Sequence, residues 1–570
     1  MTSSAGAATA QPTPTVKPAI DSPSLATLEK RVAGALAGDD TAGQTTRKSS
    51  LSASTNTASA DPKIIGGTDT TITSAPWMAQ LWYYDDKGTT DESDDLGFFC
   101  GGTVVAPTKI LTAAHCVKGY DWHANGAVIT GTSQLPTSDD AGNTDLHGGT
   151  VTGVWRQWNH PSYSSTTINN DIAVLTLPVA VKATPIRMTT SGDTASYTAG
   201  TSAQLYGWGR TSSTSQDISD TLKTATLPIQ SDSTCAGYYG TDFVAGHMVC
   251  AGKPATGSDT GTTSACNGDS GGPLIVNNRI VGVVSWGVVD CVEKGAYSVF
   301  TKVSTYVGAS YPRIDDTNLS GDHKADLWVR NSSTKTGYEK DSTGSAFGAR
   351  QSWGNWDGVN VVLQADLDRD GYQDLVVRDS ASGDVYWTHY VTSSGSWATK
   401  QIFDNWKTRT RIIAPGDLTG DYLPDMLSVD SSGTLWLYPG KGDGSFAARV
   451  QVGTGWNQYN SVRGHGDFTG DGKADLLARQ ASTGDLYLYK GTGKSGTGAF
   501  STRIKVRSAW TGYNAFDAVG DINGDGKADF LARTPAGTLY LYAGTGKATS
   551  EIFATRVSVG TDFEQYDIFG

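Results

Sequence analysis

The C-terminal part of the chain repeats a nonapeptide about every 50 residues, and this repeat strongly constrains the fold. NLSGDHKAD begins at residue 318, and related nonapeptides begin at residues 366, 417, 467 and 521. Each nonapeptide is followed by an alternating apolar stretch, such as GTLYLYAGTG (537–546). A period near 50 residues combined with strand-like alternation predicts the blades of a β-propeller.

The two ends of the repeated region complement each other. The first repeat lacks the aromatic-bearing lead that precedes the others, such as VGTGWNQYNSVRGHG (452–466), and residues 558–570 form a lead that no nonapeptide follows. We therefore expect the C-terminal strand to complete the first of five blades. Such a ring protects both sheet edges at its seam.

The nonapeptides carry oxygen-bearing side chains at positions 1, 3, 5 and 9, and such hard ligands suit Ca²⁺. An EF-hand also needs a carboxylate at position 12 and flanking helices. Position 12 is Ala478 in the fourth repeat and Ala532 in the fifth, and the flanks alternate like strands. The loops therefore resemble the FG-GAP/VCBS calcium-loop repeats of propellers. The alternative is that the acids only cap turns.

This resemblance implies structural calcium and a set of ligands in each loop. The first and third repeats are the weaker matches, because the first opens with Asn and Ser and the third lacks the glycine after its central Asp. The implied ligands are Asn318, Ser320, Asp322 and Asp326; Asp366, Asp368, Asp370 and Asp374; Asp417, Thr419, Asp421 and Asp425; Asp467, Thr469, Asp471 and Asp475; and Asp521, Asn523, Asp525 and Asp529.

Cysteine content and charge narrow the class of protein. All six cysteines lie between residues 100 and 291, and an even number in one window indicates disulfides in an exported protein. The net charge of -13 argues against nucleic acid or an anionic membrane as the main partner. No apolar run approaches the roughly 20 residues that a membrane span needs. We expect an extracellular, secreted protein.

The first 63 residues read as a leader. They contain no aromatic residue and no cysteine and are rich in Ala, Ser and Thr, which predicts a largely disordered segment. The N-terminus has no apolar core of the kind that a signal peptide requires. One stretch, from Ser24 to Gly38, has the apolar spacing of a short helix.

The octapeptide CNGDSGGP (266–273) places Ser270 among backbone-permissive residues. A serine becomes a nucleophile when a His base, oriented by a carboxylate, takes its proton and when backbone N–H groups face the developing oxyanion. His115 in LTAAHC and Asp171 in NNDIAVL supply these partners. Gly268 lets its own N–H and that of Ser270 converge as an oxyanion hole.

These segments together resemble the trypsin/chymotrypsin family of serine proteases. IIGG (64–67), TAAHC, DIA, GWG (207–209), CNGDSGGP and SWG (285–287) follow one another in the family's order over about residues 64–311. The resemblance implies two six-stranded β-barrels with the active site between them. The predicted fold class is thus all-β. The predicted domains are a propeptide at 1–63, a protease at 64–312 and a propeller at 313–570.

The resemblance also assigns roles to the residues. His115 would be general base and then general acid, Asp171 would hold its tautomer, and Ser270 would attack the scissile carbonyl without a cofactor. The disulfides would be Cys100–Cys116, Cys235–Cys250 and Cys266–Cys291, whereas spacing alone leaves many connectivities open. The alternative is an inactive protease fold that only binds.

PKIIGG (62–67) predicts an activation switch. In the family, cleavage before the first Ile frees an amine that pairs with the acid preceding the nucleophile. Here this means cleavage after Lys63 and an ion pair between Ile64 and Asp269, which a buried carboxylate needs. The uncut chain would then be a zymogen.

Specificity depends on the pocket for the substrate's P1 side chain. In the family, the residue at the base of this pocket lies six residues before the nucleophile. Here that residue is Ser264, and Ser285, Gly287 and Gly295 match the other small residues of the pocket. An uncharged pocket favours a large apolar or aromatic P1 side chain and makes another protease the activator. A carboxylate folding in from Asp259 or Asp290 would instead favour Arg or Lys.

The sequence therefore predicts a secreted serine endopeptidase that acts on proteins or peptides and carries a propeller for substrate or surface attachment. An adhesive, lectin-like protein with a vestigial protease module is the alternative. Aromatic residues recur in the propeller leads and would either stack on sugar rings or form the core between blades: Trp353, Trp356, Trp406, Trp456 and Trp510.

Overall fold

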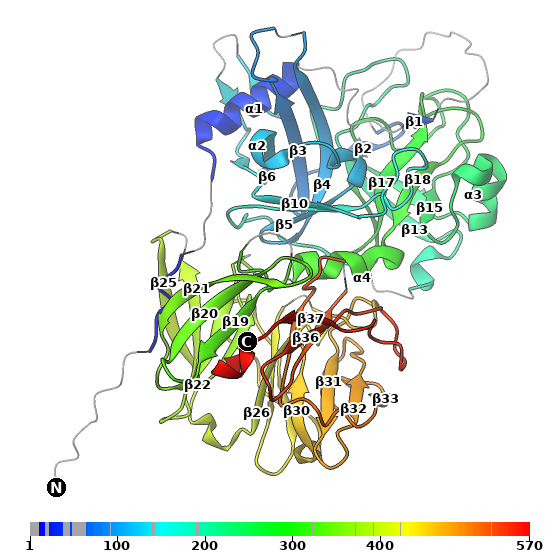
Figure 1. Ribbon diagram of the computed structural model, residues 1–570. Coiled ribbons are helices and arrows are strands. Elements are labelled where there is room, and N and C mark those ends of the chain that lie inside the picture. Colours follow the sequence, from blue (N-terminus) through cyan, green and yellow to red (C-terminus); the bar gives the residue numbers. More distant parts are fainter. Residues whose placement is uncertain are drawn as a thin grey trace. The chain divides into compact units, whose positions relative to one another are not determined.

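Figure 1 shows the computed structural model of the chain. The structure describes residues 11–17, 22–37, 46–47, 64–91, 93–139, 143–189, 193–315, 317–320, 324–370, 372–391, 393–421, 423–525 and 527–570. The chain divides into two compact units, one of Ile20–Ile314 and one of Met1–Ala19 with Asp315–Gly570. Across the described ranges, no helix is long and apolar enough to cross a membrane.

The first sheet of the unit Ile20–Ile314 has seven strands, which pair antiparallel throughout. Its order is β10 (Arg156–Asn159), β11 (Ala173–Thr176), β5 (Lys109–Thr112), β4 (Leu96–Ala106), β3 (Met78–Asp85), β6 (Gly126–Thr130) and β9 (Thr150–Thr152). The connections carry η1 (Ala114–Cys116), α2 (Trp122–Asn125) and a small ribbon of β7 (Thr137–Ser138) and β8 (Thr144–Asp145).

The second sheet of this unit has nine strands. Its main path is β15 (Met248–Ala251), β18 (Ser298–Lys302), β17 (Arg279–Val288), β16 (Pro273–Val276), β13 (Ser202–Gly207), β14 (Lys223–Pro228) and β2 (Thr68–Asp69). The short strands β1 (Thr46–Arg47) and β12 (Arg187–Met188) pair in parallel with β17. The helices are η2 (Ala195–Tyr197), α3 (Asp232–Tyr239), η3 (Gly240–Asp242) and α4 (Val303–Ile314).

Part of the leader is a helix that packs on the first sheet. Helix α1 (Leu25–Ala37) occupies the stretch in which the sequence predicts a helix. Leu28 and Val32 are buried and join a core cluster with Trp82 of β3 and Phe99 of β4. The leader is therefore ordered at this helix, which contacts the protease fold through an apolar face.

The second unit is a propeller of five four-stranded sheets, as predicted. From the inner strand outward, the blades are β38 (Tyr566–Phe569), β19 (Leu327–Asn331), β20 (Thr336–Ser342) and β21 (Phe347–Asn355); β22 (Val359–Ala365), β23 (Asp374–Asp379), β24 (Val385–Val391) and β25 (Ser396–Phe403); β26 (Arg411–Gly416), β27 (Asp425–Val429), β28 (Leu435–Tyr438) and β29 (Val450–Gly453); β30 (Tyr459–Arg463), β31 (Leu476–Gln480), β32 (Leu486–Tyr489) and β33 (Ile504–Arg507); and β34 (Ala515–Gly520), β35 (Asp529–Arg533), β36 (Leu539–Tyr542) and β37 (Val557–Gly560). Short turns η4 (Trp406–Thr408), η5 (Trp456–Gln458), η6 (Gly496–Gly498) and η7 (Phe563–Gln565) lie in the connections.

The ring closes where the sequence predicts. The C-terminal strand β38 pairs antiparallel with β19, so that Val329 lies opposite Phe569 and Arg330 opposite Ile568. The last strand in the chain is therefore the inner strand of the first blade. This confirms the predicted five-bladed seam.

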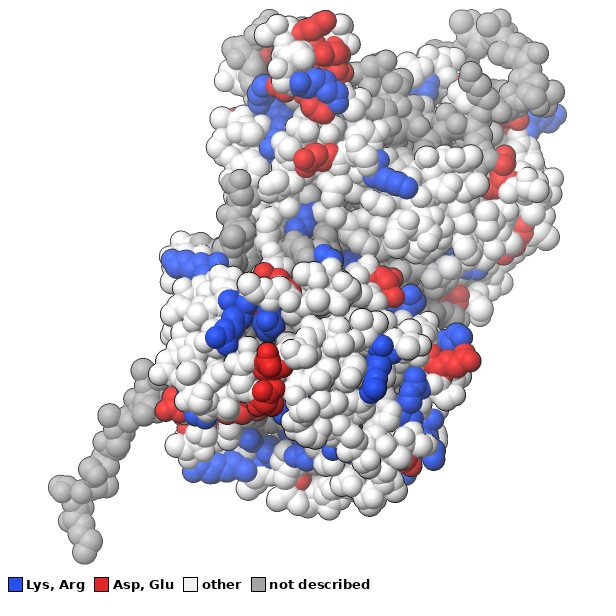
Figure 2. All heavy atoms as spheres, in the orientation of Figure 1, with Lys and Arg blue, Asp and Glu red and all other residues white. Residues whose placement is uncertain are grey.

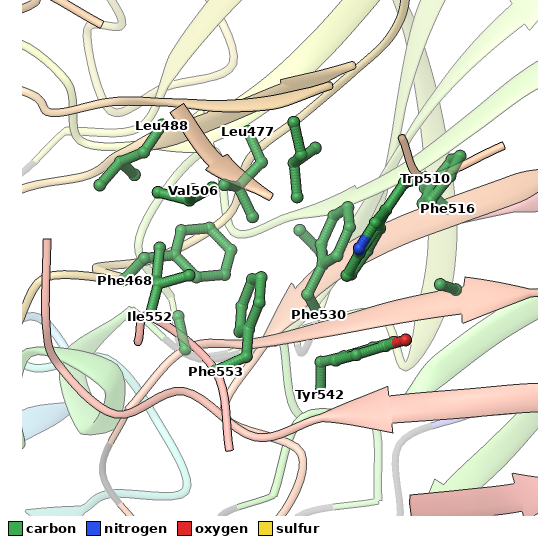
Figure 3. Packing of buried hydrophobic residues seen from close by; sticks show 14 of the residues in the cluster. Phe468, Leu477, Leu488, Val506, Trp510, Phe516, Phe530, Tyr542, Ile552 and Phe553 are labelled. Atoms are coloured by element: carbon green, nitrogen blue, oxygen red, sulfur yellow. The ribbon is translucent and has the colours of Figure 1, made fainter. Parts of the chain in front are cut away.

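The recurring tryptophans pack inside the propeller rather than on its surface. All five are at least nine-tenths buried, and each belongs to an apolar cluster: Trp353, Trp356, Trp406, Trp456 and Trp510. Figure 3 shows the cluster that joins the fourth and fifth blades, in which Trp510 stacks near Phe530 and Phe553. These indoles hold neighbouring blades together, and none of them offers an exposed stacking surface.

Candidate active site and calcium loops

His115 lies in a short turn that the surrounding structure fixes. The turn η1 follows β5, and the disulfide between Cys116 and Cys100 of β4 ties it to the first sheet. The backbone N–H of His115 donates to Oδ1 of Asp171 at 2.8 Å, and its Nδ1 lies 2.8 Å from Oδ2. Because an ionised carboxylate only accepts, Nδ1 is the donor in this bond, which selects the tautomer whose lone pair is on Nε2 whenever the ring is neutral.

Asp171 is buried, and both its carboxylate oxygens and its backbone carbonyl accept hydrogen bonds. It lies just before β11, after a turn in which Asn170 has φ of 59°. Ser285 of β17 donates its hydroxyl to Oδ2 at 2.6 Å, and Thr301 donates to the Asp171 carbonyl at 2.6 Å. The sequence assigns Ser285 to the substrate pocket, whereas its hydroxyl also helps to orient the carboxylate.

Ser270 lies in the turn before β16, where its carbonyl accepts the N–H of Gly101 of β4 at 2.7 Å, and it is 7% exposed. Gly268 has φ of 91°, and a Cβ there would crowd Ile218 and Gly209, so only glycine suits the position. Within the described residues, the N–H groups of Gly268 and Ser270 donate to no acceptor, and Nε2 of His115 is buried without a hydrogen-bond partner.

Asp269 points away from Ser270 into the second sheet. Its carboxylate accepts from the N–H groups of Gly209 at 2.8 Å and Cys266 at 2.9 Å. Complete burial raises its pKa to about 7. A side chain at Gly207 or Gly209 would collide with this carboxylate, which explains the glycines of the GWG motif. No ion pair to Asp269 is formed by a side chain of the described residues.

The predicted cleavage site lies between Lys63 and Ile64, and the structure describes the second of these residues. Ile64 is buried in the apolar cluster of the second sheet, with Leu205 of β13 and Leu274 of β16. Ile65 bridges to Ser264, whose N–H donates to the Ile65 carbonyl at 3.0 Å. Lys63 lies outside the described residues.

A cavity of about 340 Å³, open to solvent, lies next to Ser270. Its lining carries no charged side chain; it consists of Ala265, Cys266, Asn267, Ser270, Val284, Ser285, Trp286, Gly287, Val288 and Cys291. Ser264 lies beneath this wall and donates its hydroxyl to the carbonyl of Cys291 at 2.8 Å. The cavity therefore has the position and polarity of an uncharged P1 pocket.

The other specificity candidates lie outside this lining. Gly295 packs against the Tyr238 ring. Asp259 is held by Ser212 and by the N–H of Ser213, both at 3.0 Å, and Asp290 is exposed. Neither carboxylate therefore lines the cavity.

The second propeller loop gathers four carboxylates. Ligand atoms of Asp366, Asp368 and Asp370 lie within 4.8 Å of one another. Burial and the neighbouring carboxylates raise the pKa of Asp370 to about 9 and that of Asp374 well above its usual value. Oδ1 of Asp374 is buried and has no hydrogen-bond partner among the described residues. Crowded, buried acids of this kind fit a divalent cation with oxygen ligands.

The acids of the other loops also organise the turn itself. In the last loop, Oδ1 of Asp521 accepts from the N–H groups of Gly524 and Asp525, and Asp529 accepts from Ile522, Asn523 and Gly544. Equivalent bonds to the ninth position occur at Asp425 and Asp475. Turn capping and metal binding are compatible, because each carboxylate oxygen has two lone pairs.

The remaining loop positions are placed as follows. Asp417 and Asp467 accept from backbone N–H groups of their own loops. Thr469 and Asp471 lie within the fourth loop, and Thr419 and Asp421 lie within the third. In the first loop, Asp326 lies near Glu339 and Asp341 of β20, while Asn318 and Ser320 hydrogen-bond to each other; Asp322 lies outside the described residues.

Comparisons with known proteins agree with this geometry. The family model described as trypsin matches residues 64–309. A trypsin from Saccharopolyspora erythraea is 38% identical over 243 residues, which are 43% of this chain and 94% of the relative. The chain belongs to the trypsin family of serine proteases. As a trypsin-family serine endopeptidase, it acts on proteins or peptides.

Other relatives cover the same part of the chain. Trypsin I-P1 from Gallus gallus is 32% identical over 248 residues (43% of this chain, 87% of the relative), and brachyurin from Leptuca pugilator is 33% identical over 244 (43% and 95%). The model described as an FG-GAP-like repeat matches residues 366–428, 417–478 and 467–532. The first repeat lies outside these matches.

The trypsin-family disulfides form as predicted: Cys100–Cys116, Cys235–Cys250 and Cys266–Cys291. One residue that supports the cavity wall at Ala265 was missed. Ser298, the first residue of β18, is buried and accepts the N–H of Ala265 at 2.9 Å through its hydroxyl.

Proposed function

We propose that the chain is a secreted zymogen whose His115–Asp171–Ser270 triad cleaves after large apolar or aromatic residues once the chain is cut after Lys63. The hydrogen-bond network from Ser285 through Asp171 to Nδ1 of His115 is the observation that carries the proposal. Nε2 of His115, on the other side of the ring, has no hydrogen-bond partner among the described residues.

The chemistry follows from these groups. Ser270 Oγ attacks the scissile carbonyl while Nε2 of His115 accepts its proton, and Asp171 stabilises the resulting imidazolium. The N–H groups of Gly268 and Ser270 donate to the oxyanion of the tetrahedral intermediate. His115 then gives the proton to the leaving amine, the amide C–N bond breaks, and water hydrolyses the acyl-enzyme by the same steps.

Burial of Asp269 supports the activation step. A carboxylate held in an apolar site gains most from a cation that arrives beside it. Cleavage before Ile64 supplies an amine on a residue that already packs in the same sheet. The leader strand β1 also pairs with Gly287 and Val288 at the pocket, which is consistent with an inactive uncut chain.

The uncharged lining of the 340 Å³ cavity supports the P1 preference. The test is hydrolysis of peptides varied only at P1 by the chain cut after Lys63, with Ser270→Ala as the control. Cleavage after Phe, Tyr or Leu is expected. Cleavage after Arg or Lys would overturn the proposed P1 preference and implicate Asp259 or Asp290. Equal activity of the uncut chain would overturn the proposal that it is a zymogen.

The propeller is proposed to bind calcium and to attach the protease to a substrate or surface. Bound Ca²⁺ would neutralise the acids of each loop and tie its two ends together, as in the cluster of Asp366, Asp368 and Asp370. The three disulfides support secretion, because such bonds persist in oxidising compartments. Deletion of 313–570 should lower activity on insoluble substrates and spare soluble peptides.

A further inference from the structure

The mouth of the propeller's central channel is a cavity of about 960 Å³. The first residues of the inner strands line it, including Asn360 of β22, Arg411 of β26 and Asn460 of β30. Each of these strands runs from the mouth towards its acidic loop, which begins at 366, 417 or 467. The mouth therefore lies at the opposite end of the inner strands from the proposed calcium sites.

Four blades share an arginine clamp beside this mouth. In each clamp, an arginine of the second strand of the blade donates Nε to a side-chain oxygen of an Asn or Asp near the start of an inner strand. One of its terminal nitrogens also donates to two backbone carbonyls in the segment that leads into the next blade. The pairs are Arg330 with Asp567, Arg378 with Asn360, Arg479 with Asn460 and Arg533 with Asn514. The carbonyl contacts span 2.6–3.2 Å, so these four guanidinium groups are structural.

The third blade departs from this pattern. Val429 occupies the clamp position, Thr410 occupies the inner-strand position that is Asn or Asp elsewhere, and Arg411 lies opposite Val429. Arg411 donates through its terminal nitrogens to the carbonyls of Thr410 at 2.5 Å, Asn460 at 3.0 Å and Tyr459 at 3.5 Å. Its Nε is buried and has no acceptor among the described residues. This guanidinium thus retains donor capacity at the channel mouth.

A second arginine faces the same cavity. Arg463 of β30 donates Nε to the carbonyl of Phe516 at 2.7 Å and lies 3.7 Å from Asp517. Burial and the positive charge of Arg463 lower the pKa of Arg411. Two guanidinium groups that line one cavity would both be stabilised by an anion between them.

The charge of the mouth is locally positive on an acidic chain. Its lining contains Arg411, Arg463, Arg479 and Arg533 but a single acid, Asp567. That acid is already paired with Arg330, whose NH2 lies 2.7 Å from its Oδ2. On the face shown in Figure 2, charges of both signs are instead scattered among mostly uncharged atoms.

We propose that the channel mouth binds an oxyanion, a carboxylate or sulfate group, between Arg411 and Arg463. The cavity is open to solvent and extends beyond the two arginines, and amides and hydroxyls line part of the rest of it. The Ser461 hydroxyl and the amide N–H groups of Asn360 and Asn514, whose oxygens accept from the clamps, suit the hydroxyls of a sugar that carries the anion. The ligand class is an acidic saccharide, which would give the propeller a substrate or matrix to attach to.

The test is calorimetric titration of the full-length Ser270→Ala chain with sodium sulfate, D-glucuronate and D-glucose in separate experiments. Glucuronate is expected to bind and glucose is not. The Arg411→Gln variant should weaken glucuronate binding about 10–100-fold, because a hydrogen bond to a charged group is lost. Arg449→Gln is the matched control, because it removes the same charge from an exposed residue that lies outside the cavity.

Each outcome bears on the proposal. Sulfate binding without glucuronate binding would keep the oxyanion site and overturn the saccharide ligand. No binding of either anion up to about 10 mM, which corresponds to very weak affinity, would overturn the site. Equal losses in Arg411→Gln and Arg449→Gln would overturn it too. If Arg411→Gln lowers the melting temperature, Arg411→Lys retains the charge and should restore part of the binding.

Discussion

The buried carboxylate of Asp269 makes a quantitative prediction about the uncut chain. Its pKa is raised to about 7 by burial, against an ordinary value of 3.8. Between these two pH values the folded chain keeps a proton that the unfolded chain has released, so the folded state loses stability as pH rises. A shift of about three units corresponds to roughly 4 kcal/mol, fully lost above pH 7.

The perturbation is Asp269→Asn in the uncut Ser270→Ala chain, and the assay is urea unfolding at about pH 4 and about pH 8. Other titrating groups are common to both chains and cancel in the difference. We expect the free energy of unfolding of the Asp269 chain to fall by up to about 4 kcal/mol more than that of the variant. Cleavage after Lys63 should abolish most of this excess, because the Ile64 amine lowers the pKa of Asp269. Identical pH dependence in the two uncut chains would refute the reasoning.

Four further outcomes are expected. Asp171→Asn should lower kcat about 10⁴-fold with little change in KM, because His115 loses the partner that fixes its tautomer; a loss under 10-fold in peptide hydrolysis would contradict this role. Ser264→Asp should shift P1 preference towards Lys and Arg by about 10–100-fold, measured as a ratio of kcat/KM values; an unchanged ratio would remove Ser264 from the pocket base. Saturating calcium should raise the melting temperature of the propeller by about 5–10 °C, with a smaller rise in Asp368→Asn; equal melting with chelator and calcium would argue against the loops. Val32→Asp should release α1 and speed amide exchange over residues 25–37; unchanged exchange would show that α1 does not depend on its buried face.

Features set by local spacing could be predicted from the sequence. The nonapeptides predicted five blades, and the mismatched ends of the repeat predicted the pairing of β38 with β19. The pairing of His115 with Asp171 could be expected because TAAHC and DIA are short and characteristic. In these cases a few adjacent residues fix the backbone and, with it, the side-chain position.

Features that depend on long-range packing were harder to predict. The bond from Ser285 to Asp171 joins residues 114 positions apart, and spacing alone does not indicate it. Ser298 was missed because its role comes from the start of β18 lying beside Ala265. The leader helix was predicted from its apolar face, but its burial against Trp82 depends on the finished sheet.

The most direct test of the account is to identify the residue that reacts with a serine-directed fluorophosphonate. The chain cut after Lys63 would be treated with the reagent, digested and analysed by mass spectrometry. We predict one stoichiometric adduct on Ser270 and none in His115→Ala, whose base is missing. An unmodified Ser270 in the cut chain, or equal labelling of the His115→Ala variant, would contradict the proposed triad.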